Sequence, residues 1–266
     1  MASQAEFTST VAENYEKHRG TMIFMPYAKD MAARLHGNIS SLLEIACGTG
    51  QVTRLLRAQF PDARITASDL SPEMIEVAKK IIGEQDKIEW LIADAMALPF
   101  DENAFDAVIC QFGLMFVPDK QKGVEEAYRV LKPGGRFIFS TWDTLQNNPI
   151  NSIAQEVTNS FFKNEPLTFC EIPFSMYDPE ELKKLMTDGG FKNVKVQKIS
   201  LRGYSPSARD AVIGLTTGSV IYSNLAEQRP ELIQEIQDKI TEAFIKEFGA
   251  ENLSIPLSAW ITEGIK

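Results

Sequence analysis

Short apolar runs alternate with amphipathic stretches in the first half of the chain, from about residue 41 to residue 142. The apolar runs predict strands, and the stretches between them carry apolar residues at helical spacing. The predicted strands are 41–46, 64–69, 88–92, 105–111 and 136–142, and the predicted helices are 51–60, 72–82 and 119–131. Strands separated by helices of this length are joined by right-handed crossovers. The pattern therefore predicts a doubly wound, mainly parallel α/β sheet with helices on both faces.

Capping residues mark the start of two predicted helices. Ser71 precedes Pro72, and Asp178 precedes a helix predicted over 179–187. A serine or aspartate at this position accepts a hydrogen bond from the first helical turn, and proline fits the first position within the helix. Gly83 is a suitable end for the first of these helices.

The pattern beyond residue 145 is less regular. It predicts helices over 149–163, 208–225 and 231–248, and strands over 193–201 and 253–261 that bring the sheet to seven. Apolar side chains recur every fourth residue in the last helix, and such a stripe packs into a core more often than it lines a pocket. The stripe consists of Leu232, Ile236, Ile240, Phe244 and Phe248.

The charge of the chain argues against a nucleic-acid partner. There are 27 basic and 36 acidic side chains, for a net charge of -9. Binding to a phosphate backbone requires a stripe of Lys and Arg, whereas the basic residues here form no run longer than a pair. A negative surface of this size chiefly favours solubility.

The composition also bears on the compartment. No stretch of about 18 apolar residues occurs, so we expect no membrane span, and the polar first twenty residues predict no signal peptide. The three cysteines lie in unrelated contexts, which predicts a reducing compartment, the cytoplasm, without a disulfide framework. The sequence allows a homodimer without specifying one.

The segment 44–50, Glu-Ile-Ala-Cys-Gly-Thr-Gly, lies between a predicted buried strand and a helix. Ligands bind beyond the carboxyl ends of the strands in an open parallel sheet, and glycines there let the backbone approach a ligand closely. Asp69, Asp94 and the pair Gln111-Phe112 end the next three strands. Each alone is compatible with a turn or capping residue, but four polar or glycine-rich strand ends at one edge favour a ligand site.

The chemistry of these strand ends suggests a nucleoside. The carboxylate of Asp69 suits a ribose diol, and that of Asp94 suits the exocyclic amine of adenine. A dinucleotide is the nearest alternative, but its Gly-x-Gly-x-x-Gly signature requires a third glycine where this chain has Thr53. Glu44 is unfavourable beside a pyrophosphate and suits an ammonium group. A nucleoside with a cationic amino-acid tail therefore fits better.

Four segments together resemble the successive motifs of class I S-adenosylmethionine (SAM)-dependent methyltransferases. They resemble most closely the branch that includes the ubiquinone- and menaquinone-biosynthesis methyltransferases. The resemblance extends over about residues 41–143, with a weaker similarity over 7–34. The segments are LLEIACGTG, ITASDLSPEMIEVAKK, ADAMALPFDENAFDAVICQFGLMFVPD and EAYRVLKPGGRFIFSTWD.

The resemblance implies a Rossmann-like methyltransferase fold with a helical cap, SAM as cofactor and S-adenosyl-L-homocysteine as product. It implies one domain over 1–266, with a SAM-binding core at about 36–145 and cap segments at about 1–35, 146–177 and 203–250. Ala46 stands where the family often has glycine, a small departure. The residues implied to bind the cofactor are Tyr15, Glu44, Ala46, Cys47, Gly48, Gly50, Asp69, Leu70, Met74, Asp94, Ala95, Met96, Gln111 and Phe112.

Methyl transfer depends mainly on holding donor and acceptor in line and excluding water, so a general base is optional. No catalytic dyad stands out. His18 is a weak candidate for a base, and an exposed lid histidine is the alternative. Tyr15, in the same segment, resembles a lid aromatic whose face attracts a cation. No Cys/His/Asp spacing suggests a metal site.

The acceptor is the least determined part of the function. Many apolar and aromatic residues in the cap segments suit a small apolar or aromatic molecule, although they are equally suited to packing. O- or C-methylation is favoured over N-methylation. The alternatives are methylation of a protein or nucleic acid, a SAM-binding module without turnover, and, least favoured, an oxidoreductase.

Overall fold

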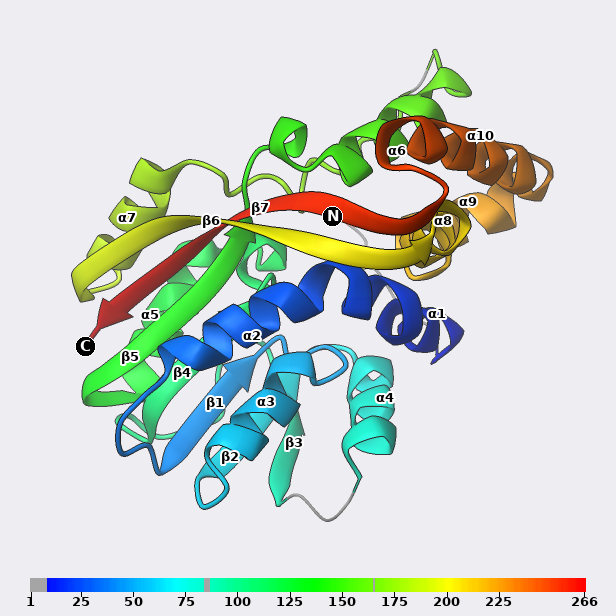
Figure 1. Ribbon diagram of the computed structural model, residues 1–266. Helices are drawn as coiled ribbons and strands as arrows, with labels where there is room; N and C mark the ends of the chain where they lie inside the picture. The colour runs from blue at the N-terminus through cyan, green and yellow to red at the C-terminus, as the bar shows by residue number, and fades with distance from the viewer. Residues whose placement is uncertain (1–8, 84–86, 165) are drawn as a thin grey trace. The chain divides into compact units, whose positions relative to one another are not determined.

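The computed structural model describes residues 9–83, 87–164 and 166–266 (Figure 1). The chain forms two compact units. The helical unit comprises residues 1–26, 144–171 and 200–257, and the sheet unit comprises residues 27–143, 172–199 and 258–266. The predicted cap segments at 1–35 and 146–177 include residues 1–8 and 165, which lie outside the described residues.

The sheet has seven strands in the order β3-β2-β1-β4-β5-β7-β6. Strands β1 to β5 are parallel, and β7 pairs antiparallel with β5. This confirms the predicted seven-stranded, mainly parallel sheet. The strands are β1 Ser41–Ile45, β2 Arg64–Asp69, β3 Ile88–Ile92, β4 Phe105–Gln111, β5 Leu131–Trp142, β6 Lys192–Ser207 and β7 Glu251–Ile265. The strand order reverses between β1 and β4, which is where open α/β sheets bind their ligands.

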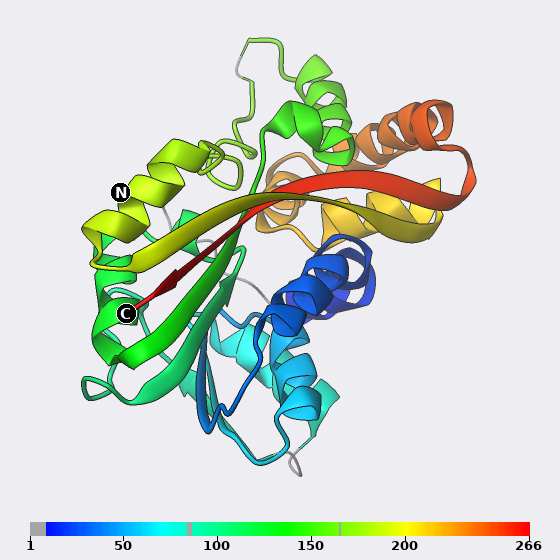
Figure 2. The ribbon, with the colours of Figure 1, turned by 60° about the vertical axis from the view of Figure 1, so that its left-hand side comes forward.

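Helices cover both faces of the sheet unit, and α3 and α5 lie on opposite faces of the sheet (Figures 1 and 2). Both predicted caps form: Ser71 Oγ accepts a hydrogen bond from Met74 N at 3.2 Å, and Asp178 Oδ1 accepts one from Glu180 N at 2.8 Å. The helices associated with the sheet are α2 Met25–Arg34, α3 Gln51–Gln59, α4 Pro72–Ile82, α5 Lys120–Val130 and α7 Pro179–Asp188, with a 3-10 turn at Leu114–Phe116.

The helical unit contains a ten-residue π-helix, Tyr15–Phe24, that the sequence pattern did not predict. The predicted apolar stripe of the last helix is core, since Ile236, Ile240 and Phe244 are fully buried. The other helices of this unit are α1 Ser9–Asn14, α6 Pro149–Ser160, α8 Ala208–Thr217, α9 Val220–Gln228 and α10 Pro230–Phe248, with a 3-10 turn at Leu145–Asn147.

The prediction of one helix over 208–225 is wrong. The helix breaks at Gly218. The backbone of Tyr15 approaches this residue so closely that an added Cβ would lie only 2.9 Å from Tyr15 Cα, so the position requires glycine. Several predicted ends also differ. The helix predicted over 149–163 ends at Ser160, and the strands predicted over 136–142, 193–201 and 253–261 are longer. Pairing with β5, from Trp142 opposite Ala259 to Arg136 opposite Ile265, continues β7 beyond the predicted end at residue 261.

All three cysteines are buried and free. Within the described part of the chain, every helix is too short or too polar to span a bilayer.

A buried ion pair joins the last three strands of the sheet. Asp143, just after β5, accepts hydrogen bonds from Lys198 Nζ of β6 at 2.6 Å and Ser258 Oγ of β7 at 2.8 Å. The Asp143 side chain is 3% exposed, whereas that of Lys198 is 44% exposed. Lys198 also lies 5.5 Å from the centre of the Trp260 ring. The lysine therefore supplies the counter-charge for a carboxylate that water reaches poorly.

We expect Lys198→Met to lower the free energy of unfolding by about 1–3 kcal/mol, because it leaves the charge of Asp143 buried without its cation. Lys184→Met is the matched control, since its partner Asp188 is 48% exposed, and it should cost less than about 0.5 kcal/mol. Urea unfolding at neutral pH measures both. Equal effects of the two substitutions would show that the Asp143 pair contributes no more than a surface ion pair.

Candidate functional site

The loop between β1 and α3 has a backbone shaped by positive φ angles. Ala46, Gly48 and Gly50 have φ of 53°, 54° and 78°. A Cβ added at Gly48 would meet no atom within 4 Å, whereas one at Gly50 would lie 2.9 Å from Ile82 Cδ1 and 3.2 Å from Trp90 Cη2. Gly50 is therefore required for packing. Gly48 leaves open space directly above the backbone, where a ligand can approach.

The end of β4 packs directly on this loop. A Cβ at Gly113 would lie 2.3 Å from Ala46 Cβ and 2.9 Å from Cys110 Sγ. The extra methyl of Ala46, the one departure from the family pattern, thus occupies room that Gly113 provides by lacking a side chain. The residues that follow β1 and β4 are therefore in contact. This proximity is needed if both strand ends are to bind one ligand, as the sequence predicts.

Asp69 joins the end of β2 to the same loop. Its Oδ2 accepts a hydrogen bond from Gly48 N at 2.8 Å, and its Oδ1 accepts one from Ser71 N at 2.9 Å. Burial raises the pKa of this carboxyl above its ordinary value, against the lowering effect of the two amide donors. The carboxylate therefore shapes the glycine loop, a structural role that the sequence did not reveal.

Glu44 is the most strongly perturbed acid of the site. It is 1% exposed at the end of β1, and the hydroxyl of Thr53 donates a hydrogen bond to its Oε2. Burial raises its pKa from 4.5 to about 8, with a further rise from the nearby charge of Asp69. Thr53, which the sequence marked only as a missing third glycine, thus holds the buried carboxyl group in place.

Gln111 and Phe112 have different surroundings at the end of β4. Gln111 Oε1 is buried and has no hydrogen-bond partner among the described residues, so it is an acceptor available to a ligand. The ring of Phe112 instead stacks on Trp142 at 3.9 Å and meets Tyr27 edge-on at 5.3 Å. The backbone of Phe112 is strained, with a φ of 51°. A hydrogen bond from its N–H to Ser140 Oγ, at 3.0 Å, stabilises this conformation.

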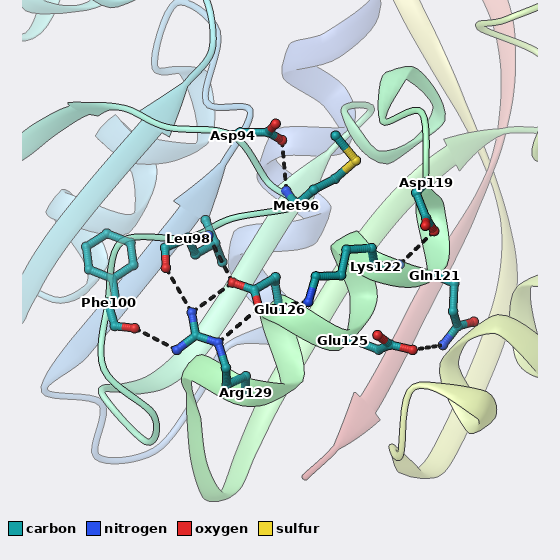
Figure 3. A network of polar contacts seen from close by, with 10 residues as sticks. All are labelled: Asp94, Met96, Leu98, Phe100, Asp119, Gln121, Lys122, Glu125, Glu126 and Arg129. Atoms are coloured by element: carbon teal, nitrogen blue, oxygen red, sulfur yellow. Dashed lines mark hydrogen bonds and ion pairs between the residues drawn. The ribbon is translucent and has the colours of Figure 1, made fainter.

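Asp94 forms a turn after β3, in which its Oδ1 accepts a hydrogen bond from Met96 N at 2.8 Å. The following segment is anchored by α5 (Figure 3). Arg129 donates to Leu98 O at 2.8 Å and to Phe100 O at 2.7 Å, and Glu126 Oε2 accepts from Leu98 N at 2.9 Å.

Arg129 also donates to Glu126 Oε2 at 2.8 Å, and this bond is the main reason that the pKa of Glu126 is lowered. The motif around 126–135 therefore has a positioning role, because it fixes the connection that carries Asp94 and Met96. The sequence contains these residues in a recognised motif but gives no sign of their partners.

The remaining predicted residues of the sheet unit vary in exposure. Leu70 is 50% exposed beside Asp69, a position open to an apolar contact, while Met74 is buried. Ala95 and Met96 are half-buried. The Cys47 side chain points into a core cluster with Ala67 and Ile75, so only its backbone belongs to the loop surface.

Tyr15 and His18 belong to the helical unit. The Tyr15 ring stacks on Phe24 at 5.2 Å. His18 is half-buried, and burial together with the charge of Lys17 lowers its pKa, so it is neutral at pH 7. Their roles toward a cofactor stay predictions.

These donors and acceptors fit the predicted cofactor. The loop offers an open approach at Gly48, Gln111 offers an unpartnered buried acceptor, and two acidic side chains lie at the ends of β1 and β2. Among the described residues, no group of three or more His, Cys, Asp or Glu is arranged to hold a metal ion.

Comparison with known proteins gives a consistent result. A family model described as a methyltransferase domain matches residues 43–139. Demethylmenaquinone methyltransferase of Clavibacter sepedonicus is 33% identical over 188 residues, which cover 64% of this chain and 75% of the relative. The protein of the same name from Staphylococcus aureus (strain JH9) is 32% identical over 187 residues, which cover 65% of this chain and 75% of the relative.

A solved structure has the same fold. It is phosphoethanolamine N-methyltransferase 2 of Haemonchus contortus, in complex with S-adenosyl-L-methionine. The TM-score is 0.62 at 19% identity, and the match covers 97% of this chain and 57% of that chain. This similarity concerns the fold alone.

The relatives and the domain model, taken with the site, define the class of protein. The chain belongs to the class I SAM-dependent methyltransferases, in the branch that includes the quinone-biosynthesis enzymes. It is an enzyme whose cofactor is SAM.

The raised pKa of Glu44 predicts a specific pH dependence of stability. The folded-state pKa of about 8 lies above the ordinary value of 4.5, so the stabilising effect of the neutral carboxyl is complete at low pH. It is lost as the pH rises through about 8. Without ligand, Glu44→Gln should therefore gain stability relative to the wild type, by about 2–4 kcal/mol, between about pH 5 and about pH 9.

Urea unfolding across this pH range measures the difference. Glu76→Gln, at an acid that is 63% exposed, is the matched control and should show no such trend. A constant difference between the wild type and Glu44→Gln would mean that Glu44 is already ionised in the folded protein at acidic pH.

Proposed function

We propose that this enzyme transfers the methyl group of SAM to an oxygen or ring carbon of a small aromatic acceptor, of the hydroxynaphthalene or naphthoquinol type. The observation that carries the proposal is the 33% identity to a demethylmenaquinone methyltransferase over 75% of that relative's length. A macromolecular acceptor is disfavoured by the net charge of -9.

The proposal assigns the cofactor to the strand ends of the sheet unit. The open backbone at Gly48 would face the methionine portion, and Asp69 would accept from the ribose hydroxyls with the lone pairs that its two amide bonds leave. Asp94 and Met96 would lie at the adenine, and Leu70 offers an exposed apolar contact beside them. Gln111 Oε1, which is buried without a hydrogen-bond partner among the described residues, would accept a hydrogen bond from the ligand.

Glu44 would act on the ammonium group of the cofactor. At neutral pH its carboxyl is mostly protonated, because its pKa is about 8. Pairing with a cation favours the carboxylate, so binding would release this proton to solvent. The Thr53 hydroxyl keeps the carboxyl group oriented in both states.

When bound, SAM supplies a methyl group on a sulfonium, whose C–S electron pair stays with sulfur as the acceptor atom attacks. The chain's own contribution is to orient the acceptor and exclude water. His18, neutral at pH 7 because burial lowers its pKa, is the candidate to take the acceptor's proton.

Replacing Asp69 by Ala should weaken SAM binding about 10- to 100-fold, because charge-assisted hydrogen bonds to the ribose and the bond that shapes the loop at Gly48 are lost together. Asp62→Ala, at an exposed aspartate, is the control and should leave binding unchanged. Calorimetry with SAM, S-adenosylhomocysteine and NAD measures the affinities. Unchanged SAM binding in Asp69→Ala would refute the ribose assignment.

The acceptor is tested by incubating the wild type with methyl-labelled SAM and naphthalene-1,4-diol under reducing conditions. We expect a singly methylated product, with mass spectrometry showing whether oxygen or carbon carries the methyl group. 1-Naphthylamine is the comparison for N-methylation. Methylation of the amine in place of the diol, or of neither ring, would contradict the proposed acceptor class.

A further inference from the structure

The π-helix of the helical unit carries an arginine at its centre. π-Helices are rare, and where they occur they are frequently at functional sites. Residues Tyr15–Phe24 form ten successive π-helical residues, and Arg19 lies midway. An irregular helix of this length is retained only when its surroundings stabilise it.

Two glycines of α8 and its end hold the π-helix in place. A Cβ at Gly214 would lie 3.0 Å from His18 Cβ and 3.2 Å from Arg19 N, and one at Gly218 would lie 2.9 Å from Tyr15 Cα. The π-helix therefore packs closely against the backbone at two positions, Gly214 within α8 and Gly218 just after it. This close packing fixes the position at which the Arg19 side chain begins.

The guanidinium of Arg19 has no acidic partner in the part of the chain that the structure describes. None of the ion pairs formed by the described residues includes it, and its Nε is buried without a hydrogen-bond partner. The hydrogen bond from its Nη1 to Gly218 O is long at 3.5 Å, and its carbon Cζ lies 5.9 Å from the centre of the Phe24 ring. Burying a cation without a counter-charge is costly, and burial accordingly lowers its pKa.

The groups that act on Arg19 electrostatically are neutral. They are Tyr15, Cys170 and Tyr222. Burial raises the pKa of the Cys170 thiol to about 12 and that of Tyr222 well above its usual range, so neither is ionised at neutral pH. The positive charge of Arg19 is therefore not balanced within the described residues of this unit.

Tyr222, one of the groups that act on Arg19, takes part in an aromatic contact and in a closed pair of hydroxyls. The Tyr222 ring meets Phe169 at 5.4 Å, and its hydroxyl lies 2.6 Å from Thr158 Oγ1. Thr158 donates its only hydroxyl hydrogen to Ala154 O at 2.7 Å, so Tyr222 is the donor of the pair. Both hydroxyl hydrogens are used, which leaves Arg19 as the group with donors to offer a ligand.

We propose that the helical unit contains a binding site for an aromatic oxyanion, in which Arg19 binds an ionised carboxylate or ring oxygen. Guanidinium groups bind carboxylates through two parallel hydrogen bonds, and flat aromatic faces suit a planar ligand. Arg19 is partly exposed as a residue, although its Nε is buried. Identifying this ligand as the methyl acceptor rests on the proposed function, whereas the binding site itself does not.

The test uses binding in the absence of SAM, with 1-hydroxy-2-naphthoate and its uncharged carboxamide as probes. The two differ in the charge that Arg19 is proposed to bind. We expect the wild-type protein to bind the carboxylate at least about tenfold more tightly than the amide, by calorimetry. Equal affinities, or no binding of the carboxylate, would overturn the proposal without any variant.

Arg19→Met should abolish this preference, and Arg19→Lys should retain part of it, because lysine keeps the charge and loses the paired donors. Arg209→Met is the matched control, since Arg209 is in the same unit and pairs with Asp238 at 2.8 Å. Unchanged SAM binding in each variant shows that the protein is folded. A preference that survives in Arg19→Met would place the anion elsewhere.

Failure of this inference and failure of the proposed function give different results. Oxyanion binding that depends on Arg19, with no methyl transfer to naphthalene-1,4-diol, would refute the proposed acceptor and leave the site standing. Methyl transfer to the diol, with no preference for the carboxylate over the amide, would support the proposed acceptor and refute the oxyanion site.

Discussion

The carboxylate of Asp69 is the interaction on which the site depends. It accepts one hydrogen bond from Gly48 N and another from Ser71 N, and so joins the glycine loop after β1 to the start of α4 after β2. Without it, the amide of Gly48 would have no acceptor from β2, and the open backbone above the loop would lose its fixed shape. Burial raises the pKa of this carboxyl by removing the charged form from water. Hydrogen bonds from the backbone amides lower the pKa and so offset part of this desolvation cost.

The same edge of the sheet brings two buried acids together, and neither belongs to an ion pair of the described residues. Glu44 lies fully buried with a pKa of about 8, and the charge of Asp69 contributes to that rise. Such an edge favours a cationic ligand, because each positive charge that arrives relieves the repulsion and the burial cost of the carboxylates. The helical unit has the opposite character at Arg19, whose charge is not balanced by an acid among the described residues. The two units thus differ in the charge of the ligand group that each suits.

The family model matches residues of the sheet unit. The methyltransferase domain model ends at residue 139, and the relatives align over about 65% of this chain. The glycine loop and the strand ends proposed to bind the cofactor lie within the matched residues. The π-helix and α8 lie outside the residues that this model matches, and there the contacts of Arg19 are the main source of inference.

The sequence alone determined the sheet, the glycine loop and the acidic strand ends, because these depend on local periodicity and on the order of elements along the chain. The strands 64–69, 88–92 and 105–111 were predicted to the residue. Only the tertiary structure decided which groups meet across the chain. It paired Thr53 with Glu44, packed Ala46 against Gly113 and ended a helix at Gly218, where a second backbone approaches. It also left the Nε of Arg19 buried without a hydrogen-bond partner among the described residues. Contacts between residues far apart in sequence leave no periodic signal, so neither a raised pKa nor an unbalanced charge can be derived from composition or spacing.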